Sequence, residues 1–136
     1  MPDQSPAQTL TAAATKLREN AANALHISPL PWTTDQGGPY GAGVVLAGND
    51  AIVADRSCDE PEDAIDLPWI ALMHPGVGAA LVSWLLQAAR AHRAAESAAR
   101  RVWREDGDDH SRAEFIAART DQHALAVARQ LLGETG

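Results

Sequence analysis

The feature that most constrains the fold is a long stretch of small apolar residues at helical spacing. Apolar residues recur in alternating steps of four and three at Val77, Leu81, Trp84, Ala88, Ala91, Ala95, Ala98 and Val102. This heptad pattern predicts one long helix over about 75–105. Its second half (Ala88, Ala91, Ala95, Ala98 and Val102) is almost all alanine. We therefore expect a helix-association seam that another helix approaches closely, from this chain or from a second copy.

Helix-start signals predict three further helices. Ser5-Pro6 is typical of an N-cap followed by proline at the first helical position, and the helix that follows should end by about Leu25, before the prolines of 28–32. Asp66-Leu67-Pro68 repeats the cap-then-proline signal for a short helix that ends at His74-Pro75. Ser111 and Glu114 fit a capping box that would open a last helix running to Gly133.

A short antiparallel sheet is predicted between the first and second helices. The apolar runs 44–47 and 51–54 flank Gly48-Asn49-Asp50, which is a hairpin signature. Because two strands alone are marginally stable, the hairpin must pack on helices or gain a strand from residues 31–41. We predict an α+β fold, mostly helical with three to four helices and a small antiparallel hairpin or sheet around 43–55.

The length of 136 residues predicts a single domain built around one core. Its parts would be an N-terminal helix (1–27), a Pro-Trp turn with hairpin and acidic loop (28–66) and a helical part (67–136). Aromatic residues are only 4% of the chain, so the few bulky side chains should matter for packing. The expected structural anchors are Trp32, Trp69, His74, Trp84 and Phe115.

Charge is distributed unevenly along the chain. Residues 1–66 hold 3 Lys or Arg against 10 Asp or Glu, whereas residues 67–136 hold 8 of each, so the formal charge of −7 is N-terminal in origin. A negative potential repels nucleic acid and anionic lipid at long range. The expected partner is therefore another protein, preferably one with a basic patch, and a homodimer is an open alternative.

The N-terminus and the single cysteine predict a cytoplasmic protein. Met1 to Pro6 has neither the basic nor the apolar region of a secretory signal, and no stretch is apolar enough to span a membrane. Cys58 cannot form an internal disulfide, and its acidic neighbours oppose thiolate formation.

No residue pattern predicts an enzyme, a metal site or a cofactor. Among His26, His74, His92, His110 and His123, no two have the spacing that would place both on one ion from one helix. Asp108-Asp109-His110 is better explained as a polar loop, and His74 as a helix-junction residue whose ring bonds the backbone. The glycines at 37, 38, 41 and 43 precede a strand, whereas a phosphate loop follows one.

Five arginines of the long helix share one face. At about 100° per residue, Arg90, Arg93, Arg100, Arg101 and Arg104 fall within an arc of roughly 100° opposite the alanine seam. One interpretation is a solvated face paired with Glu96 and acidic loops. The other is a docking face for an acidic partner or for nucleic-acid phosphates. The acidic runs 59–66 and 105–109 allow a further hypothesis, that the protein mimics the DNA backbone and occupies a basic groove on an enzyme.

Three segments resemble those of a loose group of small proteins from actinobacterial phages and prophages, similar to the lambdoid ea-type early-region proteins. They are the Pro-x-Pro-Trp turn at Ser28–Trp32, the short hairpin over Val44–Asp55, and the aromatic-Ile-Ala to His-Pro helix pair from Trp69 to Trp84. The resemblance implies a phage or prophage accessory protein and attaches no chemistry to these motifs. We therefore expect a non-enzymatic accessory protein that binds a host or phage protein, with nucleic-acid binding and DNA mimicry as alternatives.

Overall fold

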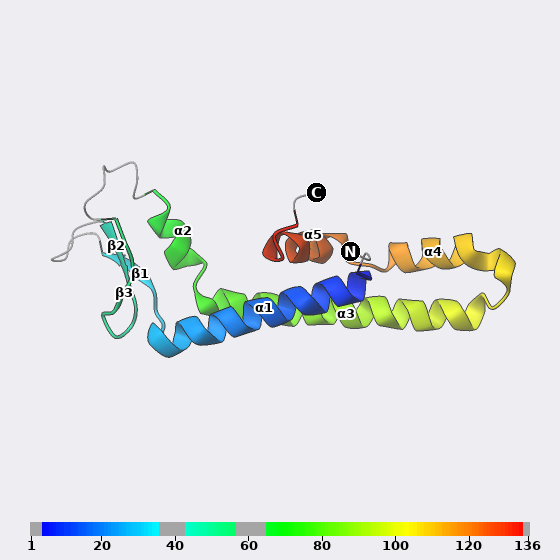
Figure 1. The fold of residues 1–136 in the computed structure, drawn as a ribbon, viewed down its shortest axis with the longest axis horizontal. Helices are drawn as coiled ribbons and strands as arrows, with labels where there is room; N and C mark the ends of the chain where they lie inside the picture. Colours follow the sequence, from blue (N-terminus) through cyan, green and yellow to red (C-terminus); the bar gives the residue numbers. More distant parts are fainter. Residues whose placement is uncertain (1–3, 36–42, 57–64, 135–136) are drawn as a thin grey trace. The chain divides into compact units, whose positions relative to one another are not determined.

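The computed structural model describes residues 4–35, 43–56 and 65–134, and the predictions for Cys58, the acidic residues 59–63 and the glycines at 37, 38 and 41 lie outside these ranges. The chain order is α1 (Pro6–Ile27), β1 (Thr33–Asp35), β2 (Val44–Leu46), β3 (Ile52–Asp55), α2 (Leu67–Leu72), α3 (Pro75–Val102), the 3₁₀ turn η3 (Asp106–Asp108), α4 (Asp109–Ala118) and α5 (Gln122–Leu131) (Figure 1). The expected mostly helical α+β fold is confirmed.

The chain divides into two compact units. Residues 1–17 and 81–136 form one, which we call the helical unit, and residues 18–80 form the other, which we call the sheet unit. Both α1 and α3 run through the boundary, so each contributes a segment to each unit.

Helix α1 begins as the sequence predicts. Ser5 Oγ accepts a hydrogen bond from the backbone N–H of Gln8 at 3.2 Å, and Gln8 Oε1 accepts one from the N–H of Ser5 at 2.9 Å. This reciprocal pair is a capping box, and Pro6 stands at the first helical position. The first turn of α1 is therefore specified locally, before any tertiary contact forms.

Alanine builds the core of the helical unit. Ten buried residues from α1, α3 and α5 form it, and six of them are alanine: Leu10, Ala13, Ala14, Val82, Leu85, Ala88, Ala89, Ala124, Leu125 and Ala128. Small side chains let helix axes approach closely, and burial of the few larger ones supplies most of the hydrophobic free energy. Figure 1 shows α5 and the first half of α1 beside α3.

The C-terminal part differs from the expected single helix. It forms two helices, α4 and α5, and the capping box expected at Ser111 is absent because α4 already begins at Asp109. Helix α5 has its own N-cap, since Asp121 Oδ1 accepts from the N–H of Ala124 at 2.9 Å. An aspartate that can cap a helix competes with continued helix, and here it ends one segment and starts the next.

The sheet unit contains the predicted hairpin and the third strand. The order is β1-β2-β3, antiparallel throughout, with Thr34 opposite Val45 in the first pair and Val45 opposite Ala54 in the second. Val44 and Val45 of the central strand are fully buried. Helix α2 packs on β1 and β2 through Leu67, so the hairpin gains both a strand and a helix.

The Pro-Trp turn and the hairpin turn are bonded to each other. Trp32 Nε1 donates to the carbonyl of Ser28 at 2.8 Å, and the N–H of Gly48 donates to the carbonyl of Pro29 at 2.7 Å. A Cβ on Gly48 would collide with the Leu30 carbonyl, so only glycine fits there.

The expected side-chain cap of α2 is not formed. Asp66 occupies the N-cap position but makes no capping hydrogen bond, and its carboxylate pairs with Arg56 at 2.9 Å. Pro68 in the first turn lacks an N–H, which reduces the number of donors that a cap would satisfy. The tertiary ion pair has replaced the local cap.

Candidate interaction surfaces

The arginine face of α3 is exposed, and part of it is paired inside the helical unit. All five residues of the arc (Arg90, Arg93, Arg100, Arg101 and Arg104) are exposed. Arg93 donates to Thr11 Oγ1 of α1 at 3.1 Å, and Arg100 donates to Glu96 at 3.2 Å. Nucleic acid would have to displace these contacts, so the arc is less suited to phosphate than its charge pattern alone suggests.

The face that α3 buries is rotated from the predicted seam. The buried residues of α3 within the helical unit are Val82, Leu85, Ala88, Ala89, His92, Ala95 and Ala99. Of the seam residues, Ala88 and Ala95 are buried and Ala98 is half-buried, whereas Ala91 is exposed and Val102 is 65% exposed. The buried stripe therefore lies roughly 90° around the helix from the seam. Bulky Val82 and Leu85 set this phase, because alanine tolerates either position.

The aromatic anchors divide into buried and exposed ones. Trp32, Trp84 and Phe115 are half-buried, and Trp84 Nε1 donates to Asp121 at 2.9 Å. Phe115 packs edge-on against Trp103 with ring centroids 5.3 Å apart. The prediction for Trp69 is wrong, since its side chain is 63% exposed.

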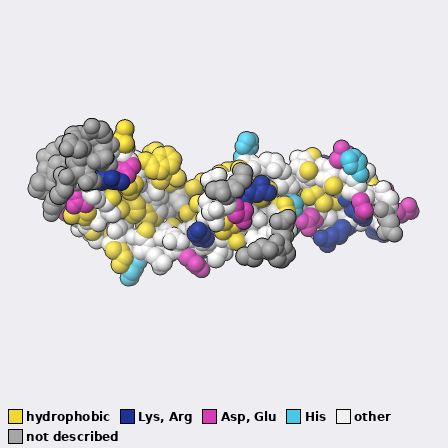
Figure 2. Space-filling model, turned by 45° about the horizontal axis from the view of Figure 1, so that its top comes forward, with side chains coloured by type: hydrophobic (Ala, Val, Ile, Leu, Met, Phe, Trp, Pro, Cys, Tyr) yellow, Lys and Arg dark blue, Asp and Glu magenta, His cyan; other side chains and the backbone are white. Residues whose placement is uncertain are grey.

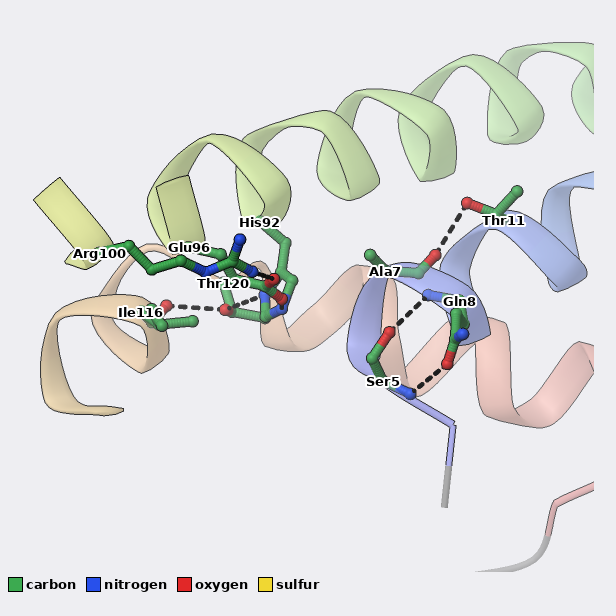
Figure 3. A network of polar contacts seen from close by, with 9 residues as sticks. All are labelled: Ser5, Ala7, Gln8, Thr11, His92, Glu96, Arg100, Ile116 and Thr120. Atoms are coloured by element: carbon green, nitrogen blue, oxygen red, sulfur yellow. Dashed lines mark hydrogen bonds and ion pairs between the residues drawn. The ribbon is translucent and has the colours of Figure 1, made fainter. Parts of the chain in front are cut away.

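A buried histidine that the sequence did not single out connects α3 to the end of α4 (Figure 3). His92 is 3% exposed; its Nε2 lies 2.6 Å from Glu96 Oε1 and its Nδ1 2.8 Å from Thr120 Oγ1. Thr120 follows α4 and donates to the Ile116 carbonyl at 2.7 Å. Because a carboxylate accepts only, Nε2 donates to Glu96. We call His92, Glu96 and Thr120 the histidine pin. The i, i+4 spacing of His92 and Glu96 is the one sequence signal for it.

The other described histidines do not assemble a metal site. His74 Nδ1 accepts from the N–H of Gly76 at 3.0 Å, which confirms the expected bond between its ring and the backbone. His110 is exposed and lies 3.6 Å from Glu114 on the next turn. In the described ranges, no three His, Cys, Asp or Glu side chains are close enough to hold one ion.

A hollow of about 430 Å³ lies between α3 and α4, on the exposed side of the histidine pin. Its charged lining consists of Glu96, Arg100, Asp109 and Arg112. Arg100 pairs with Glu96, and Arg112 pairs with Asp109. Each charged side chain of the lining is therefore paired with one of opposite sign, and the hollow offers no net charge to attract a ligand.

The outer face of α2 in the sheet unit is apolar and exposed. Leu67 faces the sheet, whereas Trp69 and Leu72 are 63% and 64% exposed and Met73 follows at 39%. Figure 2 shows hydrophobic side chains gathered where Figure 1 places α2. A continuous apolar run such as 69–73 cannot turn every side chain inward from one turn of helix. That run is the sequence signal for this face.

Large exposed apolar side chains concentrate in the sheet unit. Nine such residues are recorded among the described ones, and all but Val102 lie within residues 18–80: Leu25, Ile27, Leu30, Ile52, Ile65, Trp69, Leu72 and Met73. Scattered apolar residues are normal on a surface, but neighbouring ones such as Trp69, Leu72 and Met73 are typical of an interaction site.

A groove of about 420 Å³ adjoins the outer face of α2. One wall comes from the turn and first strand (Trp32, Thr33 and Thr34), and the other from α2 and the residue before α3 (Pro68, Ala71, Leu72 and His74). Only Leu72 belongs both to the groove and to the outer face. The groove lies wholly within the sheet unit.

The formal charge separates along the same division. Residues 18–80 hold two arginines against nine Asp and Glu, a formal charge of −7, whereas the helical unit holds nine of each sign. The apolar surface therefore belongs to the acidic part of the chain. Among the described helices, none is both long enough and apolar enough to cross a membrane.

Comparison of the sequence and structure with protein families, curated proteins and solved structures yields no match.

Proposed function

We propose that this chain is a non-enzymatic accessory protein, of the phage or prophage kind that the sequence resembles, and that it acts by binding another protein through the sheet unit. The observation that carries the proposal is the outer face of α2, with Trp69 and Leu72 more than half exposed. Tryptophan and methionine are enriched at the centres of protein interfaces, where a few such side chains supply most of the binding free energy.

Charge favours a basic partner over a second copy of this chain. The formal charge of −7 lies in the sheet unit, so two copies brought together at this face would repel each other. A partner whose apolar patch has a basic rim would instead be attracted, and its association rate would fall as salt is raised.

Affinity purification from the host, followed by binding measurements with the purified partner, tests the proposal. We expect the double variant Trp69→Ala with Leu72→Ala to raise the dissociation constant at least about 100-fold, because both side chains would be interface anchors. Val102→Ala is the matched control, since Val102 is equally exposed in the helical unit. A partner bound equally by all three proteins contradicts the proposal, and a homodimer lost in the double variant replaces the basic partner with a second copy.

Nucleic-acid binding through the arginine face is the alternative, favoured by the exposure of all five arginines. A salt-sensitive gel shift with duplex DNA that is lost in Arg100→Glu with Arg101→Glu would support it. No shift at low salt removes it.

A further inference from the structure

Among the described strands, β1 is an edge strand of its sheet, and it adjoins the groove. In the order β1-β2-β3, β1 pairs with β2 on one side only, and no described strand lies beyond it. Alternate residues of an edge strand direct their N–H and C=O groups away from the sheet, where another chain can pair with them. The second edge, β3, contributes no residue to the groove. Backbone pairing and a side-chain pocket therefore coincide at β1 alone.

The groove is shallow and open, and it has room for a side chain from a strand added at β1. Its volume of about 420 Å³ is within the range of pockets that hold small ligands. Ala71 and Leu72 form an apolar wall, and the ring of Trp32 is held opposite by its bond to the Ser28 carbonyl. A wall that is already fixed lowers the entropy lost on binding.

The net charge of the sheet unit favours a basic strand. Neither Asp35, which ends β1, nor Asp66, which precedes α2 and pairs with Arg56, lines the groove, so the attraction comes from the unit's overall charge. The unit as a whole carries −7. Lysine or arginine on either side of the inserted apolar residue would be attracted, and an acidic segment would be repelled.

From these observations we infer that the groove binds an extended peptide segment of the partner, which pairs with β1 as an added strand and inserts one large apolar side chain between Trp32 and Leu72, with basic residues flanking it. This inference rests on the proposed function and specifies the partner's chemistry. Strand addition is a common mode of peptide recognition in which backbone bonds supply affinity and a pocket supplies specificity.

The test uses the full chain and a fluorescein-labelled peptide, Arg-Lys-Val-Phe-Val-Lys-Arg, capped at both ends, with binding measured by fluorescence anisotropy. We expect saturable binding that weakens at least about tenfold when salt is raised, since the attraction is between screened charges. Two peptides N-methylated at alternate residues separate strand pairing from side-chain docking. In an added strand only one set of N–H groups faces β1, so one methylated peptide should lose binding and the other should retain it.

Variants at Thr33 locate the site. Thr33→Lys places a cation on the exposed edge and should weaken binding at least about tenfold, whereas the control Gln87→Lys, at an exposed position of α3 in the helical unit, should leave it unchanged. Unaltered circular dichroism would show that both variants fold. Trp69→Ala, which lies outside the groove, should change peptide affinity less than about twofold.

Three results would overturn the inference. Absence of binding, equal binding of both methylated peptides or equal binding by Thr33→Lys excludes strand addition at β1. A partner that still depends on Trp69 and Leu72 while the peptide fails would leave the proposed function standing and this inference refuted. If the peptide binds as expected while partner binding does not depend on Trp69, the inference stands and the proposed role of the outer face of α2 is contradicted.

Discussion

The helical unit and the sheet unit handle their apolar and charged residues in opposite ways. The helical unit balances its charges, buries an alanine-rich core and connects its helices through His92 and Asp121. The sheet unit carries the whole formal charge and most of the large exposed apolar side chains. The buried alanine-rich core and the exposed apolar surface therefore lie in different parts of this chain.

The same substitution in the two units should have the largest difference in effect. Leu85 is fully buried in α3, so Leu85→Ala should lower the free energy of unfolding by about 3 kcal/mol through lost transfer energy and a cavity. Leu72→Ala, on the outer face of α2, should change it by less than about 0.5 kcal/mol. Urea unfolding followed by circular dichroism measures both. Equal losses would break the comparison, because they would make the outer face part of a core.

Removing the histidine pin should cause the next largest loss in the free energy of unfolding. His92→Ala leaves Glu96 and Thr120 without their buried partner and should cost about 2 kcal/mol. The control is His110→Ala, whose exposed contact with Glu114 should contribute under about 0.5 kcal/mol. The same urea experiment compares them, and a neutral His92→Ala would refute the role of the pin.

Removing the cap of α5 should have a smaller effect. Asp121→Ala loses the bonds from the Ala124 N–H and from Trp84 Nε1 and should cost about 1 to 1.5 kcal/mol, whereas Asp121→Asn keeps a capping oxygen and should cost less.

The cap also predicts a dependence on pH. The hydrogen bond from the backbone of Ala124, and then that from Trp84, hold the pKa of Asp121 below its ordinary value of 3.8. A lowered pKa in the folded state contributes stability that is present above 3.8 and is lost as the pH falls through the folded value. The stability advantage of wild type over Asp121→Asn should therefore be constant above pH 3.8 and shrink as the pH falls through this acidic range. A difference that persists unchanged below it would contradict the assignment.

The exposed arginine pair should have the smallest effect. Arg100→Ala removes the ion pair between Arg100 and Glu96, in which the Arg100 side chain is 73% exposed. The free energy of unfolding should fall by less than about 0.5 kcal/mol, and by still less at high salt. Thermal unfolding at two salt concentrations measures it. A loss above about 1 kcal/mol would show that the arginine face belongs to the stability of the helical unit.

Local signals predicted the elements whose ends are specified by neighbouring residues. Ser5 and Gln8 form the capping box that starts α1 at Pro6, and Gly48-Asn49-Asp50 lies in the turn between β2 and β3. The capping box at Ser111 failed because the preceding 3₁₀ turn had already started α4. A cap signal predicts a helix start only where no other helical turn precedes it.

Sequence alone determined the mostly helical α+β composition, the long α3 and the placement of charge, because these depend on spacing and residue type within one segment. Only tertiary structure decided which face of α3 is buried, since alanine fits equally well on either side of the seam and the choice falls to where Leu85 and His92 meet other helices. It also decided that Trp69 is exposed. A short apolar helix can bury only one side against a three-stranded sheet, and the pairing of Leu67 with that sheet turns Trp69 outward.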